Sequence, residues 1–223
     1  MEADERNRSM IDWLIRAGFL KSSNIINAFV STPRHLFVPR GQSTYAYENI
    51  ALSTVDDSTI SQPSTVAYML EMLAPARGDK VLEIGTGSGW EACLLSRCVG
   101  TSGSVVTAEI DRRVAEFARD NIHDAGTKNV RQIVADGPMG YPALAPYDRI
   151  IYTAAAPKVP TEVFKQLGVN GYLVAPVGNT EMQKVKRFRI IKGKMYEEGD
   201  DFFVFVPLRG KGGFRSSMSS GRP

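Results

Sequence analysis

The sequence predicts an α/β fold in which a mostly parallel, twisted sheet carries helices on both faces, with a helical extension at the N-terminus. Three observations support this prediction. From residue 80 onward, short β-branched and apolar segments alternate with helix-like segments. Glycines cluster where the first of these segments ends, and acidic residues stand near the ends of several others. Such alternation is typical of parallel strands joined by helical crossovers.

The N-terminal part is expected to be helical. Apolar residues recur at helical spacing in two pieces of residues 5–31, which Gly18 interrupts. Residues 34–63 show little periodicity. A further helix is predicted over residues 64–73, and Pro63 stands near its start, where proline is tolerated.

The sheet is expected to occupy the rest of the chain. Five strands are predicted at 80–84, 104–109, 130–135, 149–153 and 171–177. Helices are predicted between them at 90–99, 112–125 and 162–167. Two further strands, at 185–191 and 202–206, are expected to pair antiparallel at the edge of the sheet.

Length and composition favour a single soluble domain. A chain of 223 residues fits one domain over 1–210, with a helical, substrate-side region at 1–75 and a cofactor-binding core at 76–210. Residues 211–223 are rich in glycine, serine and arginine, and we expect a disordered tail there. No apolar run approaches the roughly 20 residues that span a bilayer, and the N-terminus lacks an apolar signal core. We therefore expect a cytoplasmic protein without a membrane partner.

Metal and nucleic acid are not expected partners. Cys93 and Cys98 lie five residues apart in one predicted helix, which favours core packing, and the chain has only two histidines. The formal charge of +3 depends on the last fifteen residues, without which the body carries −1. A nucleic-acid binder is usually more basic than this. The basic run at 184–194 is interleaved with apolar residues, and we interpret it as a strand with a solvated face.

The most informative motif is the glycine turn that follows the first strand. Gly85, Gly87 and Gly89 alternate there, so backbone can approach a ligand closely. A dinucleotide fingerprint requires glycine at the position that Trp90 occupies. Glu83, inside the strand end, would also repel a pyrophosphate. A carboxylate before such a turn suits a ligand with a cationic amino-acid end and a ribose, and S-adenosylmethionine has both.

Acidic residues near the other strands agree with a nucleoside ligand. Glu109 lies 20 residues after Gly89, about where α/β nucleotide folds place the acceptor of the ribose hydroxyls. With Glu83, Asp136 and Asp148 it is expected to lie along one edge of the sheet. The alternative is that each carboxylate caps the helix that follows it, and for Asp148 this is the preferred interpretation.

At this point the chain resembles the protein-L-isoaspartate (D-aspartate) O-methyltransferase family. The similarity covers roughly residues 30–208, and the matching segments occur in the family's order. Thr59-Ile-Ser-Gln-Pro63, followed about twenty residues later by the Gly85–Gly89 turn, is the most specific part. The other matching segments are Arg34–Pro39, Tyr47–Leu52, Val81–Ile84, Asp136-Gly137, Ala145–Asp148, Thr153–Pro157, Pro176–Gly178 and Phe205–Leu208.

The resemblance implies a Rossmann-like, S-adenosylmethionine-dependent methyltransferase fold, and isoaspartyl peptides and proteins as acceptors. It implies that Ser61 supplies the active-site hydroxyl. The positions implied for the cofactor are Glu83, Ile84, Gly85, Thr86, Gly87, Ser88, Gly89, Glu109, Ile110, Asp136 and Gly137. Those implied for the substrate are Thr59, Ile60, Gln62, Ala156 and Pro157. A carboxylate acceptor ordinarily has a pKa of about 4 and is already ionised at neutral pH, so no general base is required.

Some positions depart from the family's pattern. Trp90 stands where a tyrosine or another aromatic is usual, and Pro138 follows Asp136-Gly137. The stretch Thr54-Val-Asp-Asp-Ser58 replaces a glycine-containing one, and its Asp56 and Asp57 would repel a substrate carboxylate unless they point outward. Two other function classes therefore stay open. One is a methyltransferase that acts on RNA or a small molecule and docks it on residues 184–194, and the other is a non-catalytic binding module with the same fold.

Overall fold

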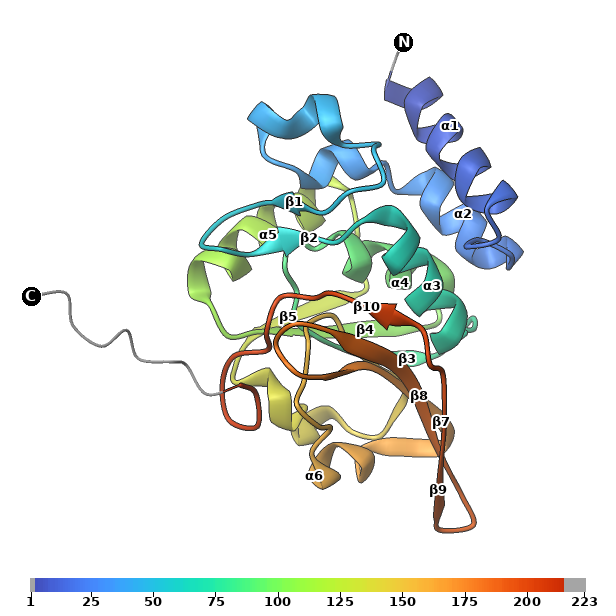
Figure 1. The fold of residues 1–223 in the computed structure, drawn as a ribbon, viewed down its shortest axis with the longest axis vertical. Coiled ribbons are helices and arrows are strands. Elements are labelled where there is room, and N and C mark those ends of the chain that lie inside the picture. The colour runs from blue at the N-terminus through green and yellow to red at the C-terminus, as the bar shows by residue number, and fades with distance from the viewer. Residues whose placement is uncertain (1–2, 215–223) are drawn as a thin grey trace, which may run out of the picture.

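An eight-stranded sheet forms the centre of the protein (Figure 1). The structure is a computed structural model, and it describes residues 3–214. The strands follow the order β10-β8-β7-β6-β3-β4-β5, and β9 also pairs with β8. Their bounds are β3 Lys80–Ile84, β4 Ser104–Glu109, β5 Val130–Val134, β6 Tyr147–Tyr152, β7 Leu167–Gly178, β8 Gln183–Ile191, β9 Lys194–Glu198 and β10 Phe202–Phe203.

Strands β7, β6, β3, β4 and β5 run parallel, which confirms the predicted fold class. Strand β8 pairs antiparallel with β7, β9 and β10, so the antiparallel part lies at one edge of the sheet. In a parallel sheet the carboxyl ends of the strands meet along one edge, where α/β folds bind ligands. The glycine turn after β3 lies at that edge.

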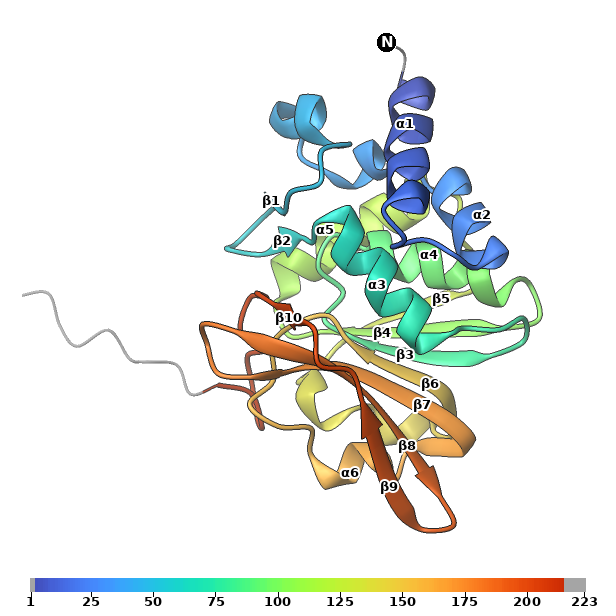
Figure 2. The same cartoon turned by 45° about the vertical axis from the view of Figure 1, so that its right-hand side comes forward.

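Helices cover the two faces of the sheet unequally (Figure 2). Five helices lie on one face of the sheet. The other face carries α6 (Thr161–Phe164) and the short 3-10 helices Gly137–Met139 and Pro142–Leu144. The five helices are α1 Ala3–Arg16, α2 Ser23–Ser31, α3 Pro63–Leu73, α4 Trp90–Val99 and α5 Arg112–Asp124. The N-terminal extension predicted from residues 5–31 is therefore α1 and α2, packed outside α3 and α4 (Figure 2).

Side-chain alternation along the strands builds a separate core on each face. Val81 of β3 packs with the five helices, whereas Leu82 and Ile84 pack on the opposite face with Tyr152. Because successive strand residues point to opposite faces, Glu83 shares the face of Val81 and points toward α4. Thr107 of β4 lies beside it on the same face, since Glu83 and Thr107 are register partners.

Some local elements differ from the sequence prediction. β9 was not predicted, because all five of its residues are exposed and no apolar alternation marks it. The strand predicted at 202–206 pairs only at Phe202 and Phe203, and the helix predicted at 162–167 is the single turn of α6. The region 34–63, which lacks periodicity, forms two 3-10 helices, Arg34–Phe37 and Arg40–Tyr45, and a small hairpin of β1 Leu52–Ser53 and β2 Thr59–Ile60.

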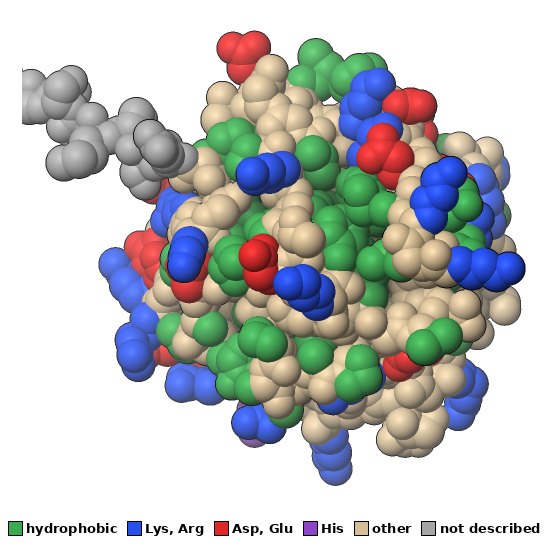
Figure 3. Space-filling model, turned by 90° about the horizontal axis from the view of Figure 1, so that it is seen from below, with side chains coloured by type: hydrophobic (Ala, Val, Ile, Leu, Met, Phe, Trp, Pro, Cys, Tyr) green, Lys and Arg blue, Asp and Glu red, His purple; other side chains and the backbone are tan. Residues whose placement is uncertain are grey.

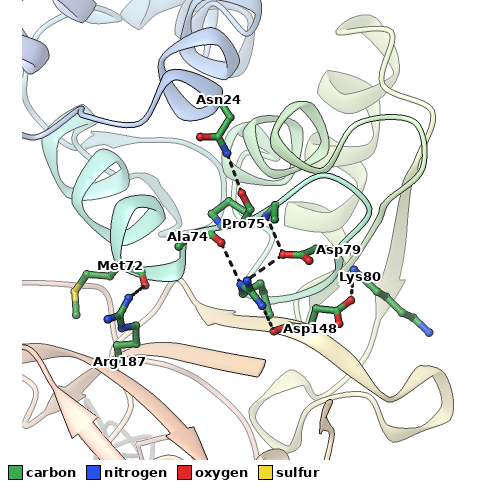
Figure 4. Close-up of polar contacts among 10 residues, drawn as sticks. Asn24, Met72, Ala74, Pro75, Asp79, Lys80, Asp148 and Arg187 are labelled. Atoms are coloured by element: carbon green, nitrogen blue, oxygen red, sulfur yellow. Dashed lines mark hydrogen bonds and ion pairs between the residues drawn. The ribbon is translucent and has the colours of Figure 1, made fainter. Parts of the chain in front are cut away.

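The expected position of Asp148 is wrong. Its carboxylate accepts a hydrogen bond from the backbone N–H of Lys80 at the start of β3 (2.8 Å), so it lies at the amino end of the sheet (Figure 4). It does not cap a helix either, because it is the second residue of β6. Next to it, Arg149 donates to the carbonyl of Ala74 (3.2 Å) and lies 3.5 Å from Asp79. A residue at the start of a strand belongs to the edge opposite the ligand.

The C-terminal segment returns to the ligand edge of the sheet. The backbone N–H of Lys211 donates to both carboxylate oxygens of Asp136, at 3.1 and 2.9 Å. Phe214 packs against the helix-side core, and its N–H donates to the carbonyl of Leu208. Residues 211–214 are therefore held against the domain, unlike the disordered tail expected there, and the remainder of that prediction, 215–223, lies outside the described residues.

Candidate functional site

A cavity of about 340 Å³ opens at the carboxyl ends of β3 and β4. Its size lies within the range of about 300–1,000 Å³ that is usual for small-molecule sites. Six segments of the chain contribute to it: the loop before α3, the glycine turn, the end of β4, and the segments after β5, β6 and β10. The lining residues that bear on the chemistry are Asp56, Asp57, Thr59, Ile60, Ser61, Glu83, Gly85, Thr86, Gly87, Ser88, Trp90, Glu91, Glu109, Ile110, Gly137, Thr153 and Arg209.

The glycine turn requires its glycines for conformational and steric reasons. Gly85 has φ +100° and lies so close to the hydroxyl of Thr153 that any Cβ would collide with it. That hydroxyl donates to the carbonyls of Gly85 (2.5 Å) and Ile84 (3.1 Å), which fixes the turn on β6. Gly89 has φ +83° and begins α4, where a Cβ would meet Ile122. Side chains are thereby excluded and backbone can face a ligand.

Glu109 joins the end of β4 to the glycine turn. One carboxylate oxygen accepts from the N–H of Gly87 (3.2 Å), and the other accepts from the N–H groups of Ile110 (2.9 Å) and Asp111 (3.2 Å). These bonds hold a carboxylate at the cavity wall, where it can accept from the hydroxyls of a ribose. Asp111 in turn caps α5, because its side chain accepts from the N–H of Arg113 (2.9 Å).

Glu83, which is buried, and Glu91, which is half-buried, form an acidic pair behind the turn. Glu83 is completely buried, and its Oε2 accepts from the hydroxyl of Thr107. The Oε1 atoms of both glutamates are buried without a hydrogen-bond partner. Burial raises the pKa of Glu83 well above its ordinary value, with the charge of Glu91 as the second cause. Burial also raises the pKa of Glu91, to about 8. Two acceptors of this kind suit a cationic ligand group.

Another wall of the cavity is the segment Thr59–Ser61. Ser61 is half-buried, and its backbone carbonyl accepts from the guanidinium of Arg34 (3.0 Å). Arg34 is completely buried, donates also to the carbonyls of Ala46, Ile50 and Ile60, and lies 5.5 Å from the ring centre of Trp90. Burial lowers the pKa of Arg34 to about 10, which leaves it charged at neutral pH. This one side chain thus anchors the loop that presents the hydroxyl of Ser61.

The structure brings most of the predicted site residues to one cavity. Those that line it are Thr59, Ile60, Ser61, Glu83, Ile84, Gly85, Thr86, Gly87, Ser88, Glu109, Ile110 and Gly137. Those that do not line it are Gln62, Gly89, Asp136, Ala156 and Pro157. Gln62 donates to Ser64 (3.0 Å), and Ala156 is buried beside Val177. The exposed carboxylate of Asp136 is engaged by Lys211 instead.

The two aspartates that depart from the family's pattern lie at the mouth of the cavity. Asp56 (φ 48°) and Asp57 (φ 62°) both adopt the left-handed conformation that favours glycine. The carboxylate of Asp56 lies 3.0 Å from Arg113 of α5, so its charge is paired. Asp57 is exposed, and no ion pair involves it within the described part of the chain.

Sequence reasoning missed three charged residues of the cavity, Glu91, Asp111 and Arg209. Glu91 follows the glycine turn directly, so its place in the first turn of α4 was a usable signal. Arg209 is distant in sequence and reaches the cavity only because the segment after β10 returns to this edge. It is exposed at the mouth.

The cations of residues 184–194 are partly neutralised. Lys184 and Lys186 lie 3.0 and 3.2 Å from Asp200, and Arg187 pairs with Glu198. On the face shown in Figure 3, basic side chains are scattered over the surface, several of them next to acidic ones. Residues 3–214 contain no helix long and apolar enough to cross a membrane. Within the same range no group of three or more histidine, cysteine or acidic residues could hold a metal ion.

Comparisons with known proteins agree with this geometry. The family model described as protein-L-isoaspartate(D-aspartate) O-methyltransferase (PCMT) matches residues 5–213. The chain is 39% identical to the protein-L-isoaspartate O-methyltransferase of Methanosarcina mazei, over 96% of this chain and 87% of the relative. It is 44% identical to that of Ignicoccus hospitalis, over 85% of this chain and 89% of the relative.

Solved structures are similar as well. A protein-L-isoaspartate O-methyltransferase matches with a TM-score of 0.84 and 32% identity, over 92% of this chain and 66% of the other. A Plasmodium falciparum protein in complex with S-adenosyl-L-homocysteine matches with a TM-score of 0.81 over 91% of this chain and 98% of the other, and its 19% identity supports the fold alone. The family match spans nearly the whole chain and confirms the resemblance carried by Thr59–Pro63 and the glycine turn. The chain belongs to the protein-L-isoaspartate (D-aspartate) O-methyltransferase family.

Proposed function

We propose that the protein transfers the methyl group of S-adenosylmethionine to the free carboxylate of L-isoaspartyl and D-aspartyl residues in damaged proteins, which initiates their repair. One observation carries the proposal: a single cavity joins the glycine turn and Glu109 to the hydroxyl-bearing wall at Ser61. A methyl donor held by the glycine turn and Glu109 would therefore lie next to a carboxylate acceptor held at Ser61.

The residues present fit the proposed cofactor. The unpartnered oxygens of Glu83 and Glu91 suit the ammonium of its amino-acid end, and the carboxylate of Glu109 suits its ribose. The backbone of the glycine turn can lie against the ligand because no Cβ intervenes. When bound, the cofactor supplies a methyl group on a sulfonium, which makes the methyl carbon electrophilic.

The protein's part in the reaction is positioning and exclusion of water. An acceptor carboxylate is ionised at neutral pH and attacks without prior proton removal. No histidine lies among the residues that line the cavity, which agrees with a reaction that needs no general base. Ser61 can donate its hydroxyl proton to one carboxylate oxygen and leave the other free to attack. Such alignment supplies much of the rate when the reacting atoms must approach in line.

The surroundings support a protein acceptor more than nucleic acid. Three cations of residues 184–194 are paired with acids, which leaves this strand less able to bind a phosphate backbone. We infer a cytoplasmic location, since Cys93 and Cys98 are both free thiols, as is usual in a reducing compartment.

The decisive experiment compares three acceptors with methyl-labelled S-adenosylmethionine: an isoaspartyl peptide, the same peptide with a normal aspartyl residue, and bulk RNA. We expect label on the first alone. The product should be a methyl ester that releases methanol in mild alkali. Alkali-stable label would indicate a nitrogen or carbon acceptor, and label on RNA would favour the nucleic-acid alternative. Binding of the cofactor without any transfer would favour a non-catalytic module.

A further inference from the structure

Glu83 and Glu91 have no charge partner in the described part of the chain. Glu83 comes from β3 and Glu91 from the first turn of α4, and both line the cavity. Each has one carboxylate oxygen, Oε1, that is buried and receives no hydrogen bond. The only donor to Glu83 within residues 3–214 is the hydroxyl of Thr107, which reaches Oε2. Because both residues line the cavity, a cationic group bound there would lie close to these unpartnered oxygens.

The groups that face this pair are acidic or neutral. Cys93 of α4 stays a neutral thiol, because burial raises its pKa to about 11. Glu109 of β4 adds a negative charge, which is held by backbone N–H groups. The nearby cations have other partners, since Arg34 is bound to carbonyls and Arg113 to Asp56. Arg209 lies exposed at the mouth of the cavity.

If Glu83 and Glu91 were both ionised, no nearby cation within residues 3–214 would compensate their two negative charges. Removing charge from water without a partner is strongly unfavourable, and a pair of this kind keeps a proton instead. The raised pKa values of Glu83 and Glu91 express the same effect. At neutral pH the empty site therefore holds at least one proton that an ordinary glutamate would have lost.

We propose that Glu91 is a second carboxylate for the ammonium group of the cofactor's amino-acid end, and that the Glu83–Glu91 pair releases a proton to solvent when the cofactor binds. No covalent bond to the ligand forms. One O–H bond of a carboxylic acid breaks, its proton goes to the buffer, and the ammonium N–H groups donate to the carboxylate oxygens that remain. This inference rests on the proposed cofactor and is independent of the acceptor.

The proposal has a thermodynamic signature. If binding releases a proton, affinity rises with pH, by up to tenfold per pH unit for each proton released. The increase stops once the pH is high enough for the pair to be ionised before binding. At pH 6.5 the ligand's own ammonium, whose pKa is ordinarily about 8, is almost entirely charged and contributes almost no proton.

Calorimetry at pH 6.5 in buffers of different ionisation enthalpy tests this directly. S-adenosylhomocysteine is the probe, since it keeps the amino-acid end but cannot react. We expect the wild type to release between about half and one proton per ligand bound. Glu91→Gln, which keeps the side-chain shape, should release at most half as much, bind roughly tenfold more weakly and show a shallower pH dependence. Glu116→Gln, on the exposed face of α5, is the matched control.

A second ligand keeps the test decisive if the variant folds poorly. 5′-Methylthioadenosine carries the same nucleoside without the amino-acid end, so the wild type should bind it without proton release. Equal proton release with both ligands, or release by Glu91→Gln equal to that of the wild type, would overturn the proposal. So would tight S-adenosylhomocysteine binding with no proton release. A wild type that binds neither ligand would overturn the proposed cofactor itself, whereas binding without transfer to isoaspartyl peptide would count only against the acceptor.

Discussion

The guanidinium of Arg34 donates to the backbone carbonyl of Ser61 at 3.0 Å, across 27 residues of sequence. Arg34 also bonds three other carbonyls, those of Ala46, Ile50 and Ile60. Because Arg34 is completely buried, these bonds compensate a charge that solvent cannot reach. The position of the Ser61 hydroxyl therefore depends on a residue that does not line the cavity.

Arg34→Lys should destabilise the fold and slow the reaction. A lysine keeps the charge, but a single ammonium cannot reach all four carbonyls, and each buried acceptor left unpaired costs about 1–3 kcal/mol. We expect a loss of roughly 2–4 kcal/mol in the free energy of unfolding, measured with urea. Arg40→Lys, in the same region but exposed, is the control. If the two variants were equally stable and equally active, the anchoring role of Arg34 would be wrong.

Ser61→Ala should reduce kcat much more than it weakens cofactor binding. Loss of one orienting hydrogen bond to a charged acceptor costs about 2–3 kcal/mol, or roughly 30- to 150-fold in rate. The dissociation constant of S-adenosylhomocysteine should change less than about twofold, because the cofactor side of the cavity is intact. Ser61→Thr should retain part of the rate. Ser53→Ala, on the exposed side of β1, gives the baseline, and a kcat equal to that baseline would exclude Ser61 from the chemistry.

The glycine-turn side of the candidate site could be placed at the cavity from sequence because its signals are local. The turn at Gly85–Gly89 follows β3 directly, and Glu109 ends the next parallel strand, so the topology alone brings them together. Asp148 shows where this reasoning failed. It lies at the start of its strand, and a residue there belongs to the amino edge, beside Lys80 (Figure 4).

The other charged residues of the cavity could not be predicted from local sequence, because their positions depend on tertiary packing. The direction of Glu91 is determined by how α4 packs on β3, which a local pattern cannot specify. Arg209 reaches the cavity through an extended segment whose path is decided by the bridge between Pro207 and Ala155. β9 was missed for a different reason, since a strand exposed on both faces has no hydrophobic period.

Glu109→Ala should weaken cofactor binding. The change removes the proposed ribose acceptor and also frees three backbone N–H groups of the turn and of the β4 end. Hydrogen bonds to a charged group contribute about 1.5–3 kcal/mol each, so we expect affinity for S-adenosylhomocysteine to fall at least roughly tenfold by calorimetry. Glu116→Ala on α5 serves as the control. Unchanged affinity in Glu109→Ala would remove this residue from the cofactor site.

Asp57 should bias the enzyme against acidic peptides. Its carboxylate is exposed at the mouth of the cavity, whereas that of the neighbouring Asp56 is paired with Arg113. At about 10 Å in water, two unit charges interact by roughly 0.4 kcal/mol, which corresponds to about a twofold effect. Asp57→Asn should therefore raise kcat/KM about twofold for an isoaspartyl peptide with acidic flanks, and lower it for one with basic flanks.

Salt distinguishes this charge effect from a change in loop conformation. Screening shortens the Debye length to about 3 Å at 1 M salt, so the selectivity difference between wild type and Asp57→Asn should disappear there. A difference that persisted at 1 M salt would point to the left-handed backbone of Asp57 rather than its charge. Asp12→Asn, in α1 and away from the cavity, should leave the preference between the two peptides unchanged at every salt concentration.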